Sequence, residues 1–327
     1  MPNWRHRKQP RSYRFRPGGK RKWRRVLLFA CAIILVISIG RIGSYISDYV
    51  QSVRLSAALR DAYLSEEISD VSTAPASVTR TPSPMVTATA APAATSTAEA
   101  SSTLPPYATL APMPYPQNPY RIINARFQKL RRQNEDIIGW LSAGELLSEA
   151  VVQRDNEYYL RRDYRGYHNN NGAIFLDEDC SLATRPHTLI LYGHNMKTGA
   201  MFGGLRNYEN ITYYRNSPFI SFDTIYEEGR YVVFSVAEIS LDRKSPRYSG
   251  FYRLPYCTIL ERESIIRELC KLSIHTCPID VQPDDQLLLL VTCASDNTDR
   301  RIVAARRVRD GETENALYRA VQNARKQ

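Results

Sequence analysis

The segment from residue 71 to residue 118 has a composition that cannot form a hydrophobic core, so it divides the chain into two parts. Of its 48 residues, 35 are Ala, Ser, Thr or Pro, and Arg80 and Glu99 are its only charged residues. Such a composition buries too little apolar surface to offset the conformational entropy that is lost on folding. Its prolines favour extended backbone, so we predict a stalk that reaches between about 40 Å and about 150 Å. The stalk separates a short N-terminal region from residues 119–327, which have the size of one compact domain.

A basic tail and an apolar run precede the stalk. Residues 1–25 hold eleven Lys and Arg and no acidic residue, and an uncharged run follows from residue 26 to residue 40. With the apolar surface continued to residue 46 and the Arg41 side chain snorkelling, the run reaches the roughly 20 residues that a helix needs to cross a bilayer. Arg41 also interrupts the small-residue site that a signal peptidase requires. We therefore predict an uncleaved anchor over 26–46 rather than a cleaved secretory signal.

The distribution of charge sets the expected topology and partners. The net charge is +11, with 44 Lys and Arg against 33 Asp and Glu, so the eleven basic residues of the tail account for the entire excess. The charge-balanced remainder argues against a nucleic-acid partner, which would need basic residues on a folded face. The positive-inside rule predicts a cytoplasmic tail, a single span and an extracellular domain at the cell membrane. The tail is expected to lie against anionic membrane lipid.

The regions on either side of the stalk show different periodicities. Apolar residues between 47 and 70 recur near helical spacing, which predicts a juxtamembrane helix. From residue 119 onward, many short strand-like runs predict a mainly β domain with added helices (α+β), built as a barrel or a sandwich. We expect its helices over 121–134, 201–208, 261–272 and 312–324. We expect its strands over 150–153, 157–160, 173–176, 188–192, 219–222, 230–236, 286–291 and 301–305.

Five cysteines lie beyond the predicted anchor. Their odd number and wide spacing do not fit a secreted disulfide framework, so at least one free thiol is expected. Cys270 and Cys277 flank the end of a predicted helix, and their spacing leaves a bond to each other or to Cys257 as alternatives. Carboxylates beside Cys180 would raise the pKa of its thiol and reduce its reactivity. The sequence has no Cys-x-x-Cys or His-x-x-x-His pair, so we predict no metal site.

Cys293 is the candidate nucleophile. It ends an apolar strand and opens a polar loop that leads to Arg300 and Arg301. An accessible thiol with cationic neighbours favours the thiolate, which is the form that attacks carbonyl groups. His194 follows Gly193 at the end of another predicted strand, where it can serve as acid and base at the rim of the fold. His275, which lies near Cys277, is a rival for that role.

Two sequence blocks are specific in combination: Tyr192-Gly-His-Asn-Met196, and Thr292-Cys293 followed eight residues later by Arg301-Ile-Val303. Together with the segments 136–141, 151–160, 172–177 and 191–203, they are similar to the sortase family, and within it to class B. The resemblance implies a closed eight-stranded mixed barrel with added helices, an N-terminal anchor and a stalk. It also implies a membrane-bound cysteine transpeptidase of a Gram-positive cell, without a cofactor.

The resemblance assigns a role to each candidate catalytic residue. Cys293 would be the nucleophile, His194 the general acid and base, and Arg301 the group that steadies the substrate carbonyl or oxyanion. Arg301 is preferred to Arg300 because it directly precedes Ile302-Val303, the register that the family shows. Adjacent residues of a strand face opposite sides, so one arginine of the two is expected at the site.

The same resemblance suggests the substrate groove and the two substrates. Asn156, Leu160, Tyr192 and Thr292 match groove positions. The implied acyl donor is a secreted protein with a C-terminal sorting signal, and the implied acceptor is an amine of peptidoglycan or of a pilin. Val291 departs from the family pattern, in which Ser is usual at this position, so the sorting motif does not follow from the family.

Two other functions are compatible with parts of the sequence. A papain-like hydrolase would release the acyl group to water, but such enzymes place Cys before His in the sequence, and here His194 precedes Cys293. A stalked surface protein without catalytic activity would have a structural Cys293.

Overall fold

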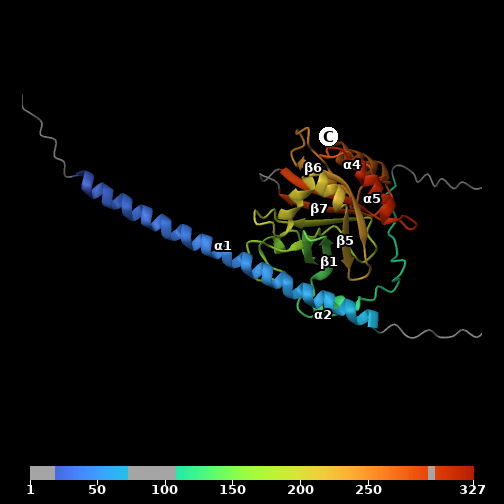
Figure 1. Ribbon diagram of the computed structural model, residues 1–327, viewed down its shortest axis with the longest axis horizontal. Coiled ribbons are helices and arrows are strands. Elements are labelled where there is room, and N and C mark those ends of the chain that lie inside the picture. The colour runs from blue at the N-terminus through green and yellow to red at the C-terminus, as the bar shows by residue number, and fades with distance from the viewer. Residues whose placement is uncertain (1–18, 73–107, 294–298) are drawn as a thin grey trace, which may run out of the picture. The chain divides into compact units, whose positions relative to one another are not determined.

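The computed structural model of the protein describes residues 19–72, 108–293 and 299–327 (Figure 1). The chain divides into two compact units, Met1–Tyr49 and Val50–Gln327. Its first element is the helix α1, which spans Gly19–Ser72 and includes both the predicted anchor and the predicted juxtamembrane helix. Among the described residues, this is the one helix that is long and apolar enough to cross a membrane. A signal sequence would meet the same test, so the uncleaved anchor stays a prediction.

Eight strands close into a barrel, which confirms the predicted fold class. Around the barrel the order is β1-β2-β3-β4-β7-β8-β6-β5. The β2–β3 and β4–β7 pairs are parallel and the other pairs are antiparallel, so the barrel is mixed. The strands are β1 (Ile137–Ala143), β2 (Leu147–Val152), β3 (Ile174–Leu176), β4 (Thr188–Gly193), β5 (Phe219–Thr224), β6 (Arg230–Ser240), β7 (Leu287–Cys293) and β8 (Asp299–Arg307).

The strand β7 ends at the candidate nucleophile, Cys293, and lies between two other strands of the barrel. It pairs with β4 on one side and with β8 on the other. Its residues Leu287 to Val291 are all buried, with at most 1% of their surface exposed. A continuous apolar run suits such a strand because both of its faces are covered. The sequence of β7 therefore fixes its place in the core, and its polar end emerges at the rim.

Seven helical elements besides α1 surround the barrel in the described residues. The longest is α4, which packs against β6. Its N-terminus is closed by a capping box, in which Thr258 Oγ1 accepts from the Glu261 amide and Glu261 Oε2 accepts from the Thr258 amide. The seven are α2 (Ala125–Arg131), η1 (Tyr158–Arg161), η2 (Phe202–Glu209), α3 (Ile211–Asn216), η3 (Phe251–Arg253), α4 (Ile259–Lys271) and α5 (Glu314–Gln322).

The strand predicted over 157–160 is wrong, because this segment forms the 3-10 helix η1. The cause is local. Asp155 Oδ1 accepts hydrogen bonds from the backbone amides of Glu157 and Tyr158, at 2.9 and 2.7 Å, and so turns the chain. An aspartate in this position favours a helical turn over an extended strand.

The compact unit extends beyond the predicted domain of residues 119–327. Tyr63 of α1 is buried, its ring stacks on Trp140 with 4.7 Å between centroids, and its hydroxyl donates to Asp223 at 2.7 Å. Tyr115, which was assigned to the stalk, is also buried, and its hydroxyl donates to the Leu182 carbonyl at 3.1 Å. Residues 73–107 of the predicted stalk lie outside the described residues. The folded unit thus includes part of α1 and the last residues of the predicted stalk, from residue 108 onward.

We expect Tyr63→Ala to lower the free energy of unfolding by about 3 kcal/mol, because it removes a buried aromatic ring and one of the hydrogen-bond donors to the Asp223 carboxyl, which keeps the Gly229 amide. Urea denaturation of the full-length protein in detergent micelles measures this difference. The control is Tyr120→Ala, since Tyr120 is 86% exposed. Its expected effect is within about 0.5 kcal/mol. Equal effects of the two variants would show that α1 does not pack on the barrel in solution.

The stability that α1 gains by packing on the barrel depends on pH through Glu149 of β2. Glu149 accepts a hydrogen bond from Ser56 of α1 at 2.6 Å, and burial raises the pKa of its carboxyl from 4.5 to about 7. The folded state then holds a proton that the unfolded state has lost, so this stabilisation is complete below pH 4.5 and disappears as pH rises through 7. We expect Glu149→Gln to match the wild type near pH 4 and to exceed its stability at pH 8 by at most about 3 kcal/mol. Denaturation curves at both pH values measure the difference, and a constant gap between the two proteins would contradict it.

Candidate active site

A groove opens at the ends of β4 and β7, where the two parallel strands meet the rim of the barrel. Its volume is about 280 Å³. It combines an apolar floor with a few polar groups, an arrangement that is common in sites that bind extended or small ligands. Its lining residues are Asn156, Leu160, Ala173, Phe175, Tyr192, Gly193, His194, Val291, Thr292 and Arg300.

The strand register brings His194 and Cys293 to neighbouring positions. Gly193 of β4 lies opposite Thr292 of β7 in the parallel pair. His194 directly follows Gly193, and Cys293 directly follows Thr292. The two candidate residues therefore lie next to each other where the chain leaves the sheet. The side chain of Cys293 and residues 294–298 lie outside the described part of the chain. The backbone of Cys293 is described, and in the antiparallel pair of β7 with β8 it lies opposite Arg300.

The half-buried imidazole of His194 is held by a backbone carbonyl. Its Nε2 lies 2.6 Å from the carbonyl oxygen of Leu160, at the end of η1. A carbonyl can only accept, so Nε2 carries a proton in this arrangement, and Nδ1 is the nitrogen that can take up and release a proton. Fixing the tautomer of a catalytic histidine through its second nitrogen is a general device of acid–base sites.

Gly172 makes the approach of Leu160 to His194 possible. Its φ of +63° lies in the left-handed region. A Cβ at this position would meet the Leu160 carbonyl oxygen at 2.7 Å and His194 Cδ2 at 3.1 Å. A side chain here would therefore push apart the two groups that form the hydrogen bond.

If His194 is the catalytic base, we expect Gly172→Ala to lower kcat/KM about a hundredfold, because a displacement of about 1 Å of a catalytic group has an effect of that size. The control is Gly144→Ala, since Gly144 has a similar φ of +55° but no atom within 4 Å of the added Cβ. Both variants should be destabilised by about 1 kcal/mol through backbone strain. Gly172→Ala should lose more stability because its Cβ also clashes with the Leu160 carbonyl oxygen, and only Gly172→Ala should lose activity. Steady-state kinetics and thermal denaturation of both variants measure these effects. An equal loss of activity in Gly144→Ala would mean that backbone strain, and not a displacement of His194, causes the loss.

The two arginines of β8 have different surroundings from those predicted. Arg301 is 9% exposed, and its Nη2 lies 2.6 Å from Glu209 Oε1 and 2.8 Å from Glu238 Oε1. Arg300 lines the groove, and its charge acts on the hydroxyl of Tyr192. Arg301 does not line this groove in the described residues, so its predicted role at the site stays a prediction. Because neighbouring residues of a strand face opposite sides, the ion pairs of Arg301 turn Arg300 toward the groove.

The four predicted groove residues all line the groove, together with Ala173, Phe175 and Arg300, which sequence reasoning did not identify. Asn156 Oδ1 accepts from the Glu178 amide at 3.1 Å, so this side chain is fixed at the edge. Burial raises the pKa of the Tyr192 hydroxyl, and its hydrogen bond to Asp177 adds to the shift. The sequence did contain a signal for Ala173 and Phe175, since both belong to the segment 172–177 that matches the family.

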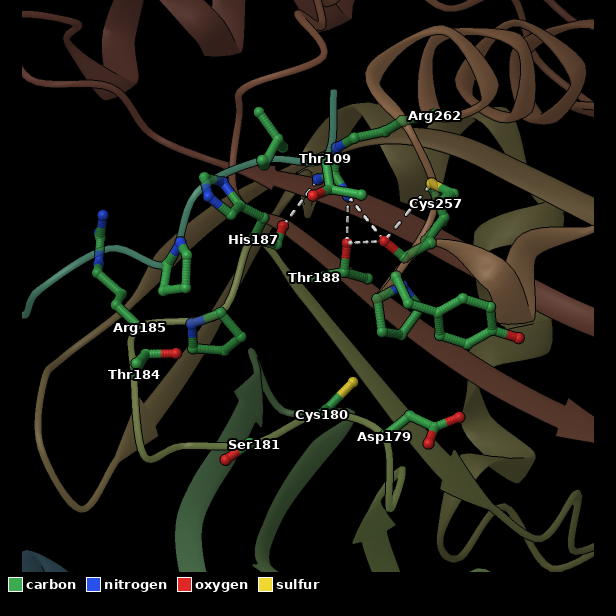
Figure 2. A pocket seen from close by; sticks show the side chains of 16 residues that line it. Thr109, Asp179, Cys180, Ser181, Thr184, Arg185, His187, Thr188, Cys257 and Arg262 are labelled. Carbon is green, nitrogen blue, oxygen red and sulfur yellow. Dashed lines mark hydrogen bonds between the residues drawn. The ribbon is translucent and has the colours of Figure 1, made fainter. Parts of the chain in front are cut away.

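A second pocket of about 170 Å³ contains two of the other thiols (Figure 2). Burial raises the pKa of Cys180 and of Cys257, so both thiols are poor nucleophiles. For Cys180 the neighbouring carboxylates add to the shift, in the predicted direction. Arg262 is buried near Cys257, and its Nη2 donates to the carbonyls of His187 and Asp285 at 2.8 and 2.9 Å. This side chain thus joins α4 to the strands and has a structural role.

The remaining candidates of the sequence also have structural surroundings. His275 is buried, it stacks on Tyr214, and its Nε2 lies 2.8 Å from the Tyr208 carbonyl oxygen. The structure shows Cys270 and Cys277 as free thiols in contact, with Cys277 Sγ 3.8 Å from the Cys270 carbonyl oxygen. Among the side chains that the structure describes, no cluster of His, Cys, Asp and Glu has the arrangement of a metal site.

Comparisons with known proteins agree with this geometry. Residues 149–308 match the family described as "Sortase domain". Sortase B of Staphylococcus aureus is 28% identical over 190 residues, which are 57% of this chain and 75% of that protein. Sortase B of Listeria monocytogenes is 26% identical over 175 residues, which are 52% of this chain and 68% of that protein. The crystal structure of sortase B from B. anthracis in complex with AAEK1 shares the fold, with a TM-score of 0.55 and 21% identity over 81% of this chain and 99% of that one.

Proposed function

The chain is a class B sortase, and hence a cysteine transpeptidase, and we propose that Cys293, His194 and Arg300 carry its reaction. The observation that supports this assignment most is the register of β4 and β7, which places His194 and Cys293 at neighbouring strand ends. The groove beside them is lined by Arg300, and the Leu160 carbonyl orients the imidazole.

The proposed acylation step uses each residue once. The thiolate of Cys293 attacks the scissile carbonyl and forms a tetrahedral intermediate. His194 then donates the proton on Nδ1 to the leaving amine as the C–N bond breaks, which leaves a thioester on the enzyme. The guanidinium of Arg300 stabilises the oxyanion, an effect of roughly 3 kcal/mol per donor in acyl transfer.

The second step regenerates the enzyme. An acceptor amine attacks the thioester carbonyl, His194 Nδ1 takes up the proton that the amine loses, and the thiolate of Cys293 leaves as the new amide forms. We propose that the acyl donor is a secreted protein with a C-terminal sorting signal and that the acceptor is an amine of peptidoglycan or of a pilin. The apolar floor formed by Phe175 and Val291 supports binding of an extended peptide with an apolar side chain.

We further propose that residues 26–46 anchor the enzyme in the cell membrane, with residues 1–25 in the cytoplasm. The basic tail and the apolar stretch of α1 support this topology. The compact unit that contains the groove then lies outside the cell, where exported substrates and wall amines are found.

Product analysis tests the transfer reaction. The full-length protein in detergent micelles is incubated with a series of sorting-signal peptides, with and without an amine such as triglycine. Transpeptidation predicts an amide product that grows with amine concentration while the hydrolysis product declines. Release of the acyl group to water alone, even with abundant amine, would instead establish a hydrolase.

A further inference from the structure

The hydrogen bond between His194 and Leu160 depends on a carbonyl whose own position must be fixed. Leu160 lies near the end of η1, and the chain then makes an excursion that returns at residue 173. Two backbone hydrogen bonds close this excursion, from the Asn169 amide to the Arg161 carbonyl at 3.0 Å and from the Ala173 amide to the Tyr159 carbonyl at 3.1 Å. The placement of the Leu160 carbonyl therefore depends on the residues at the returning end.

That returning end is held by a serine of α1. The Oγ of Ser52 accepts hydrogen bonds from Asn169 Nδ2 at 3.1 Å and from Asn171 Nδ2 at 2.9 Å. Ser52 is 6% exposed and both asparagines are completely buried, so the contact is protected from water. Asn169 Oδ1 also accepts from the Asn171 amide at 2.9 Å, which makes the two asparagines one unit. Gly172, which packs against the Leu160 carbonyl and His194, directly follows this unit.

We propose that Ser52 is a positioning residue for His194, acting through Asn169, Asn171 and Gly172 on the Leu160 carbonyl. The inference rests on the proposed role of His194 in catalysis. Without the Ser52 hydroxyl, two buried amides lose an acceptor, and buried donors rearrange to regain one. The excursion then shifts, the Leu160 carbonyl leaves Nε2, and the imidazole loses its fixed tautomer. The part of α1 that packs on the barrel thereby helps to position a catalytic residue.

Kinetics of the full-length protein in detergent micelles test the proposal. We expect Ser52→Ala to lower kcat by roughly ten- to a hundredfold with little change in KM, because a displaced base weakens chemistry more than binding. Ser52→Thr keeps a hydroxyl and should restore most of the activity. The control is Ser56→Ala, which removes a hydrogen bond to Glu149 one helical turn further on and should leave kcat unchanged. An equal loss in the Ser56 variant would overturn the proposal.

A spectroscopic measurement separates positioning from general damage. With histidine labelled with ¹⁵N, the neutral His194 imidazole should show a single Nε2–H tautomer in the wild type and a mixture of tautomers in Ser52→Ala. The signal is assigned by its absence from His194→Ala. Asn171→Ser, which keeps the contact of Ser52 with Asn169, is a milder second variant and should give a smaller shift toward the mixture. An unchanged tautomer in both variants refutes the positioning role, whatever their turnover.

The two proposals fail in different ways. If His194→Ala kept full turnover, the proposed catalytic role of His194 would be lost, and the tautomer measurement would still report whether Ser52 positions the ring. If His194→Ala is inactive but Ser52→Ala retains both its tautomer and its kcat, the catalytic role stands and the inference about Ser52 is wrong.

Discussion

The Cys293→Ala variant is expected to have no measurable transpeptidase activity, and His194→Ala to lose about a thousandfold or more in kcat. Removal of the nucleophile abolishes the thioester route, and the loss of a positioned acid and base alone accounts for about 10²–10⁴ in rate. Steady-state assays of amide formation with purified full-length protein measure both effects. Thermal denaturation should show that both variants remain folded.

The matched control for the nucleophile is Cys257→Ala. This thiol also lies outside the predicted anchor, but burial raises its pKa and its Sγ is 3.7 Å from the Leu254 carbonyl oxygen. The variant should retain activity within about twofold, since an inert buried thiol contributes to packing alone. Full activity of Cys293→Ala, or a comparable loss in Cys257→Ala, would mean that the nucleophile has been misassigned.

Arg300→Gln is expected to lower kcat about a hundredfold, because one oxyanion donor contributes a factor of about 10²–10³ in acyl transfer. Arg301→Gln should keep kcat within about threefold, since this guanidinium is bound to Glu209 and Glu238 rather than placed in the groove. Arg301→Gln should instead lower the free energy of unfolding, because it removes two ion pairs. The loss should be only about 1–2 kcal/mol, since both glutamates are partly exposed and water screens the ion pairs. Parallel kinetics and denaturation of the two variants provide the comparison. The opposite result, with activity lost only in Arg301→Gln, would restore the assignment that the sequence favoured.

Much of the fold follows from local sequence patterns. The apolar run that ends at Cys293 predicts a buried strand, and β7 is one, with Leu287 to Val291 in the core. The helix predicted over 261–272 is α4, displaced by one or two residues at each end. These elements were predictable because apolar periodicity and capping residues act within a few residues of the chain.

Local sequence patterns do not determine which of the adjacent residues Arg300 and Arg301 faces the groove. The two residues are adjacent and chemically identical, so the register of β8 against β7 and β6 decides which one reaches the groove. A shift of that register by one residue would exchange their faces. The family's register favoured Arg301, whereas the carboxylates of Glu209 and Glu238 draw that residue away. Glu209 lies far from Arg301 in the sequence, so this ion pair leaves no local signal.

Two other features of the site depend on distant contacts. The group that orients His194 is the backbone carbonyl of Leu160, and any residue type at position 160 would supply the same oxygen. The helical spacing of residues 47–70 predicts a helix but not the surface that Ser52 and Tyr63 contact. Both features follow from tertiary packing, which single-sequence patterns do not encode.

Mapping of the covalent intermediate tests whether Cys293 is the nucleophile. Full-length protein in micelles is mixed with a sorting-signal peptide, quenched in acid, and digested for mass spectrometry. The proposed mechanism predicts an acyl adduct on Cys293 that hydroxylamine removes and that disappears as the amide product forms when an amine is added. An adduct on Cys180, Cys257, Cys270 or Cys277 during turnover, or turnover in which no thioester can be trapped on Cys293, would contradict it.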